Sequence, residues 1–128
     1  MKFLISMLIM FAVGRYLPAT DIGDDVVAAI SVGNAHALVK WFSSNVDLTV
    51  LGKEEMYSKA QAEQILRDFF FKYPAKSFKL RHGSSKPSAT QYGIGSYKST
   101  NGHTFRIYFL IRKIGNQSFI QQFSVESE

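Results

Sequence analysis

The side chains that could transfer protons are few in this sequence, and they lie far apart along the chain. Asp47 is the only carboxylate in the alternating segment at residues 46–50, where Thr49 shares its face. If that face lines a pocket, Asp47 could act as a general base. Its candidate proton-transfer partners are Tyr108, Tyr92 and His82. The alternative interpretation of Asp47 is a solvated aspartate on an edge strand, which carries out no chemistry.

Residue types that serve other chemistries are missing or wrongly spaced. The chain has no cysteine, which excludes disulfides, thiolate metal sites and cysteine nucleophiles. The three histidines, His36, His82 and His103, lack the spacing of metal ligands. Gly93 and Gly95 form a GxG motif inside a predicted strand, with no helix following, so they are not a nucleotide-binding fingerprint. The sequence therefore predicts no metal and no cofactor.

The N-terminal segment predicts export. A lysine precedes residues 3–13, a run of largely apolar side chains. This run is shorter than the roughly 20 residues of a membrane span and has the length of a signal-peptide core. Cleavage fits after Ala19 or after Gly14, and a buried N-terminal helix is the alternative. We predict a secretory signal peptide over residues 1–19 and a single domain over residues 20–128, periplasmic or extracellular and without a membrane span after cleavage.

The elements that would position these side chains change in kind at Pro74. Apart from the strand at 46–50, apolar residues before it recur at helical spacing, and after it they alternate as in strands. The predicted helices begin at Asp24, Asn34 and Ser58 and end at Gly33, after Phe42 and before Pro74. The further strands are a short one at 55–57 and four antiparallel ones at 76–82, 90–99, 104–113 and 118–126. The predicted fold class is α+β, a curved antiparallel sheet with three helices on one face.

The long predicted helix ends with one phenylalanine outside its apolar stripe. The helix starts at a capping box formed by Ser58 and Gln61. The stripe consists of Ala62, Ile65, Leu66, Phe69, Phe70 and Tyr73. Phe71 lies about 180° from the start of that stripe at ~100° per residue. Either the helix unwinds before Pro74 and returns the ring to the core, or Phe71 contacts solvent, the first helices or a second subunit.

Two segments carry a resemblance to a known superfamily. They are "GNAHALVKWFSSNVDLTV", which contains a helix stop, a capped helix and a strand, and "MYSKAQAEQIL", which leads into the long helix. Their order resembles the nuclear-transport-factor-2-like (NTF2-like) superfamily, which includes SnoaL-like and ketosteroid-isomerase-like proteins of cystatin-like fold. The sequence is most similar to a group of small secreted bacterial proteins with a domain of unknown function. The resemblance implies a cone-shaped NTF2-like barrel.

The resemblance also implies a pocket between the helices and the sheet. Enzymes of the superfamily place a carboxylate base and a tyrosine donor in this pocket. Aligned by eye, those positions fall on Val50 and Val26, which have no proton to transfer. The pocket implied for this chain is therefore non-catalytic and suits a small apolar ligand. The residues assigned to it are Trp41, Phe42, Phe70 and Tyr92.

The second face of the predicted sheet is the other candidate site. Alternation gathers there Lys79, Arg81, Arg106, Tyr108, Leu110, Arg112, Ile120 and Gln122. Arginine and tyrosine among aliphatic side chains are typical of interfaces, and the resemblance implies a homodimer through this face. Binding of an anionic envelope component, such as lipid headgroups or acidic glycans, is the alternative. A solvated face that binds nothing is the simplest interpretation, and export argues against nucleic acid.

Charge divides the predicted mature chain into two parts. Residues 20–68 have four basic and eight acidic side chains, a net charge of −4, and residues 69–128 have nine basic and two acidic ones, a net charge of +7. These patterns predict an exported, non-catalytic binding module that uses the pocket, the second sheet face or both. The alternative is a small enzyme with isomerase- or dehydratase-like acid–base chemistry around Asp47, with Tyr108 or His82.

Overall fold

The computed structural model of the protein describes residues 22–84 and 89–128. The helices are α2 (Ile22–Val32), α3 (Ala35–Val39) and α4 (Lys59–Lys72). The strands are β1 (Phe42–Val50), β2 (Lys53–Ser58), β3 (Ala75–Gly83), β4 (Thr90–Ser99), β5 (Thr104–Ile114) and β6 (Gln117–Ser127). The predicted signal peptide and both of its cleavage sites lie outside the described residues.

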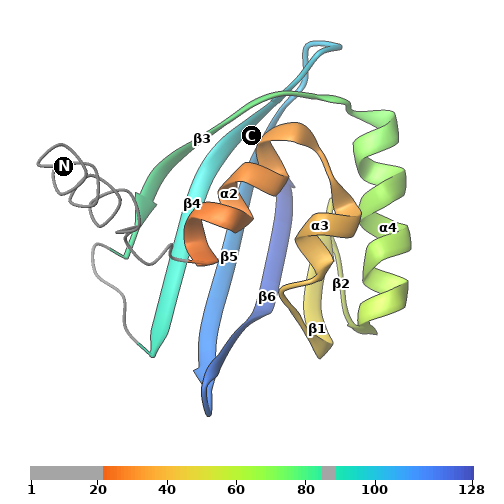
Figure 1. The fold of residues 1–128 in the computed structure, drawn as a ribbon. Coiled ribbons are helices and arrows are strands. Elements are labelled where there is room, and N and C mark those ends of the chain that lie inside the picture. The colour runs from red at the N-terminus through yellow and green to blue at the C-terminus, as the bar shows by residue number, and fades with distance from the viewer. Residues whose placement is uncertain (1–21, 85–88) are drawn as a thin grey trace, which may run out of the picture.

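One curved sheet carries all six strands, and the helices pack on one of its faces (Figure 1). The strand order is β2-β1-β6-β5-β4-β3, so the sheet is open, with β2 and β3 at its edges. The strands from β3 to β6 form the predicted antiparallel meander, and β2 pairs back on β1. The pairing of β1 with β6 is parallel, which the sequence did not predict. The predicted α+β class and the three helices on one face are confirmed.

Side-chain caps fix where two of the helices begin. The Asn34 side chain accepts a hydrogen bond from the backbone N–H of Ala37 at 3.0 Å, and α3 starts after it. The predicted capping box of α4 is present, because Ser58 Oγ accepts from the Gln61 N–H and the Gln61 side chain accepts from the Ser58 N–H. The second helix is shorter than predicted: Phe42, assigned to its apolar face, begins β1 instead.

An aromatic cluster attaches α4 to the sheet. Phe69 packs against four rings, with centroid separations between 5.0 and 5.8 Å: Phe70, Tyr73, Tyr97 and Phe105. Tyr97 is fully buried, and its hydroxyl donates a hydrogen bond to the backbone carbonyl of Tyr73 at 2.6 Å. Burial raises the pKa of Tyr97 to about 12, so the hydroxyl stays protonated and remains a donor.

Phe71 remains on the helix and faces outward. Helix α4 continues through Lys72, and the Phe71 side chain is 87% exposed. The interpretation in which the helix unwinds and returns this ring to the core is therefore wrong. The predicted stripe holds, since Ala62, Leu66, Phe69 and Phe70 are buried and Ile65 and Tyr73 are partly buried.

Two bulges move side chains to the face opposite the one predicted. The register between β3 and β4 shifts after Leu80, so that His82 pairs with Ile94 and no longer shares the face of Phe78. A second shift in the β5–β6 pairing places Ile120 beside Ile111, fully buried in the core. Alternation from Phe78 and Leu80 predicts His82 on the helix-covered face, and that prediction is wrong. The predicted assignment of Ile120 to the other face is wrong as well.

The contact between Gly93 and Phe109 gives a test of the sheet. A Cβ on Gly93 would lie 2.3 Å from the Phe109 ring, which packs across β4 and β5. We therefore expect Gly93→Ala to lower the free energy of unfolding by about 1–3 kcal/mol, measured by chemical denaturation. In the double variant with Gly93→Ala and Phe109→Leu, the ring is absent. Its loss in the free energy of unfolding should be smaller than the sum of the losses in the two single variants. Additive losses would contradict this contact.

Candidate functional site

The sheet face away from the helices, here called the outer face, collects most of the predicted interface residues. Val46 and Leu48 are buried toward the helices, so the alternating residues Asp47 and Thr49 lie on the outer face. Register extends this face across the sheet, because Thr49 pairs with Ser124. Its other members include Glu54, Met56, Gln122, Glu126, Arg106, Tyr108, Leu110, Arg112, Tyr92, Ile94, Lys79, Arg81 and His82.

An apolar patch lies on β4 and β5 of the outer face. Tyr92 is 45% exposed on β4 and pairs with Leu110, which is partly buried on β5. Met56, 65% exposed on β2, lies in the same row but is separated from Leu110 by Asp47 and Gln122. Tyr108 and Ile94 pair with each other one row away along the strands. The outer face therefore presents apolar and aromatic side chains in the pattern of a protein interface.

The two ends of the outer face carry opposite charges. Asp47, Glu54 and Glu126 lie on β1, β2 and β6. Lys79, Arg81, Arg106 and Arg112 lie on β3 and β5. Arg81, His82 and Arg106 line a cleft of about 120 Å³ that also reaches Glu128, whose carboxylate accepts a hydrogen bond from buried Ser96 at 3.1 Å. Among the described residues, none of the four outer-face cations has an ion pair.

The acidic end contains a pair of interacting carboxylates. Glu54 lies diagonally across β1 and β2 from Asp47, because Thr49 pairs with Glu54 and Asp47 pairs with Met56. A hydrogen bond with Asp47 and repulsion between the two carboxylates raise the pKa of Glu54, and Glu126 adds further repulsion. The carboxylates at the acidic end of the outer face therefore repel one another more than the groups around them stabilise their negative charge.

The candidate acid–base residues are not brought together. Asp47 is on the outer face of β1, and His82 is on β3, four strands away and thus about 19 Å across the sheet at ~4.8 Å per strand. Tyr108 on β5 is two strands from Asp47, with β6 between them. The described partner of Asp47 is Glu54. Val26, at the position expected for a donor, is fully buried hydrocarbon.

The residues predicted to line one ligand pocket lie in different places. Phe42 is buried in the core against Phe123, at a centroid distance of 5.7 Å, and Trp41 is partly buried beside it in the chain. Phe70 is buried beneath α4, whereas Tyr92 lies at the outer face and borders a cavity of about 90 Å³. That cavity, between the start of α2 and strands β3 to β5, is small for a ligand site.

A larger cleft of about 510 Å³ lies on the helix side, at the junction of α2 and α3 with α4. Two residues that the sequence singled out line it, the outward-facing Phe71 and Phe70, which was predicted to line a ligand pocket. Sequence patterns did not indicate the cleft itself, because it depends on how three helices meet. The described residues contain no group of three or more His, Asp or Glu side chains that could hold a metal. They also contain no helix of sufficient length and apolarity to cross a membrane.

A curved sheet with helices on one side and an outer face free of them is the architecture of NTF2-like proteins. An NTF-2-like protein of unknown function from Shewanella oneidensis MR-1 has this arrangement, with a TM-score of 0.56 at 16% identity over 81% of this chain and 92% of that chain. The chain therefore has an NTF2-like fold.

The family within this fold class is also defined. Residues 23–126 match the family described as "Domain of unknown function (DUF4783)", and the chain belongs to this family. Crystal structures of DUF4783 proteins are similar to it. The one from Bacteroides uniformis ATCC 8492 has a TM-score of 0.78 at 26% identity, over 84% of this chain and 98% of that chain. The one from Bacteroides ovatus ATCC 8483 has a TM-score of 0.75 at 27% identity, over 88% and 96%. A comparison with curated protein sequences found no match.

The carboxylate pair makes stability depend on pH. The raised pKa of Glu54 means that the folded state holds this proton more tightly than the unfolded state. The resulting stabilisation is fully present below the ordinary glutamate pKa of 4.5 and is lost as the pH rises through the raised value. We therefore expect Glu54→Gln to melt at a higher temperature than the wild type at neutral pH, and this difference to close below pH 4.5.

The neighbouring Glu55 supplies the matched control for this measurement. Glu55 is exposed on β2 and pairs with Leu48 instead of lying beside Asp47. Glu55→Gln should leave the melting temperature nearly unchanged across the same pH series. Equal shifts in the two variants, or a lower melting temperature for Glu54→Gln at neutral pH, would contradict the assigned repulsion.

Proposed function

We propose that this protein is an exported, non-catalytic binding module that forms a homodimer through the outer face of its sheet. One observation carries the proposal: on this face an apolar patch on β4 and β5 is flanked by carboxylates on β1, β2 and β6 and by cations on β3 and β5, and these cations have no ion pairs among the described residues. A surface of this kind is complementary in charge to a second copy of itself, and its apolar side chains can pack against those of the second copy.

The strand order allows this complementarity to be stated residue by residue. A two-fold axis parallel to the strands, between β5 and β6, would place β6 over β5, β1 over β4 and β2 over β3 of the second copy. Arg106 and Glu126 occupy the same row. Arg106 of each copy would therefore face Glu126 of the other copy across the dimer. Glu54 and His82 also share a row and would face each other in the same way.

The composition of the face favours a second copy over an anionic envelope component. A polyanion would contact Lys79, Arg81 and Arg106 favourably but would be repelled by Asp47 and Glu54 on the same surface. The homodimer uses both ends. A non-catalytic role is supported by the separation of Asp47 from His82 and Tyr108.

Charge exchange at Arg106 and Glu126 tests the dimer. In the proposed arrangement Arg106→Glu places a carboxylate opposite Glu126 of the second copy. We therefore expect it to weaken self-association at least about tenfold, and Glu126→Arg to do the same. The double variant should restore the wild-type dissociation constant, measured by sedimentation equilibrium. Lys40→Glu, an exposed charge reversal on the helix side, is the control and should not change it.

Two results would contradict the dimer. The first is a wild-type protein that stays monomeric at all concentrations up to the high micromolar range. The second is a double variant as defective as either single variant, since this would show that the two side chains do not face each other. Tighter binding of wild-type protein to anionic vesicles than to itself would instead favour the envelope component.

Export is tested separately by the mass of the protein in the cell. The apolar run at residues 3–13 supports a signal peptide, and we expect the intact mass of the mature protein to match a chain that begins at Thr20. A chain that begins at Arg15 would place the cleavage after Gly14 instead. Recovery of the full chain from Met1 in the cytoplasmic fraction would refute export.

A further inference from the structure

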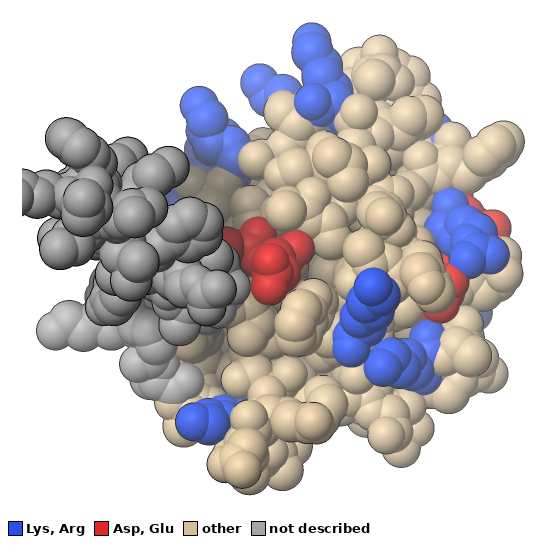
Figure 2. Space-filling view, viewed as in Figure 1, with Lys and Arg blue, Asp and Glu red and all other residues tan. Residues whose placement is uncertain are grey.

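The helix-side cleft of about 510 Å³ is formed entirely by residues of α2, α3, α4 and the turn between α2 and α3. It lies on the opposite side of the molecule from the outer face, so the inference below is independent of the homodimer. Its volume is within the roughly 300–1,000 Å³ range of small-molecule sites. Figure 2 views the helix side, where the surface between α2 and α4 is largely uncharged; acidic atoms lie over the start of α2, and others lie among basic ones at the edge beside α4.

Apolar side chains form two walls and the floor of this cleft. Val32, at the end of α2, is 71% exposed, and Phe71 on α4 is 87% exposed. These two are the most exposed large hydrophobic side chains in the described residues. The floor contains Phe70 and Gly33, and a Cβ on Gly33 would lie 3.5 Å from the Phe70 ring. An apolar body held between Val32 and Phe71 would remove both side chains from water.

The polar groups at the edge of the cleft are mainly donors. The Asn34 side chain uses its carbonyl oxygen to cap α3, which leaves its NH₂ group for another acceptor. Arg67 also lines the cleft, and the described contact of its guanidinium uses only Nη2, at 2.5 Å from Glu63 Oε2. An acceptor group on the ligand, above all a carboxylate, would therefore find hydrogen-bond donors on both sides.

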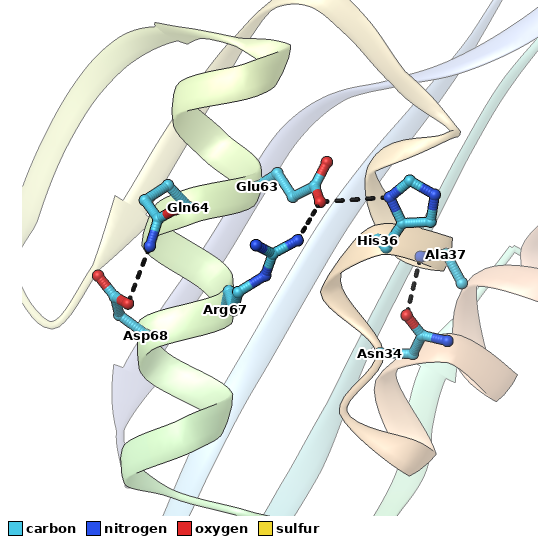
Figure 3. A network of polar contacts seen from close by, with 7 residues as sticks. All are labelled: Asn34, His36, Ala37, Glu63, Gln64, Arg67 and Asp68. Carbon is cyan, nitrogen blue, oxygen red and sulfur yellow. Dashed lines mark hydrogen bonds and ion pairs between the residues drawn. The ribbon is translucent and has the colours of Figure 1, made fainter.

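The acidic residue nearest the cleft is already satisfied. Glu63 is not among the lining residues, and its Oε2 atom contacts both Arg67 and Nδ1 of His36, the latter at 3.2 Å. Figure 3 shows His36 on α3 and Arg67 on α4 both directed toward Glu63. This bridge joins the two helices that flank the cleft and holds Arg67 at its edge. Glu63 also competes with a ligand carboxylate for the guanidinium, which makes its removal informative.

We propose that this cleft binds a small monocarboxylate with an apolar or aromatic body. The body lies between Val32 and Phe71 over Phe70, and the carboxylate accepts hydrogen bonds from Arg67 and Asn34. The ligand needs both the apolar body and the carboxylate. A purely apolar ligand would leave the donors of Arg67 and Asn34 unpaired.

Binding of 3-phenylpropanoate to the folded protein tests the proposal, with 3-phenylpropanamide as the uncharged analogue. Titrations followed by amide NMR shifts should show saturable binding of the acid, with the largest shifts at Gly33, Ala35 and Phe71. The amide should bind about tenfold more weakly, because it cannot form charge-assisted hydrogen bonds with Arg67. Equal affinities, no saturable shifts at millimolar acid, or shifts concentrated around Leu80 and Gly83 would overturn it.

Variants separate the binding role of these side chains from a structural one. Phe71→Ser should weaken both ligands, and Ile114→Ser, the matched loss of an exposed apolar side chain at the end of β5, should weaken neither. Arg67→Gln should abolish the preference for the acid. Glu63→Gln frees the guanidinium and should tighten binding of the acid several-fold, whereas a purely structural role for this bridge predicts weaker binding. Unchanged affinity in Phe71→Ser, or weaker acid binding in Glu63→Gln, would refute the proposed site.

Discussion

The packing of Phe69 among the rings of Phe70, Tyr73, Tyr97 and Phe105 is the interaction on which the arrangement of helix and sheet depends. It joins the C-terminal half of α4 to β4 and β5, and the hydrogen bond from the Tyr97 hydroxyl to the Tyr73 carbonyl fixes the end of the helix. Because a helix turns by about 100° per residue, two consecutive inward rings leave the third outside. The exposure of Phe71 is thus a geometric result of how firmly Phe69 and Phe70 are held.

The two faces of the sheet are used differently. The helix-covered face is filled by large side chains, and the cavity left near Leu80 measures only about 90 Å³. The outer face has no helix over it, yet it contains partly buried tyrosine and leucine side chains together with charges of both signs. In the described part of the chain, the surfaces available for recognition include the outer face and the cleft beside α4.

Sequence patterns predicted those features that depend on neighbouring residues. The capping box at Ser58, the end of α4 before Pro74 and the four strands after it are all local, and all are present. Features that depend on distant contacts were missed. Phe42 has helical spacing but pairs with Ile120 from the other end of the chain, and this contact decides that it begins a strand.

Bulges limited the prediction of the candidate sites. Alternation assigns every second residue to one face, but one extra residue reverses the assignment for the rest of the strand. His82 reached the outer face in this way, beside the arginines, and Ile120 entered the core. No residue type in "KLRH" or "FIQQ" marks the shift. The pocket residues were missed for a different reason. A cavity forms where packed segments leave space unfilled, and no sequence pattern marks such a space.

The position of β6 has a consequence for how the chain acquires its structure. This last strand lies inside the sheet, between β1 and β5, and its parallel pairing with β1 is the only link in strand order between the first two strands and the meander. The contacts that complete the core therefore join residues separated by most of the chain, and loops of that length must close before those contacts can form. A ribosome-bound chain that still lacks β6 can form α4 and the hairpin of β1 and β2, but it has no continuous sheet against which to pack them.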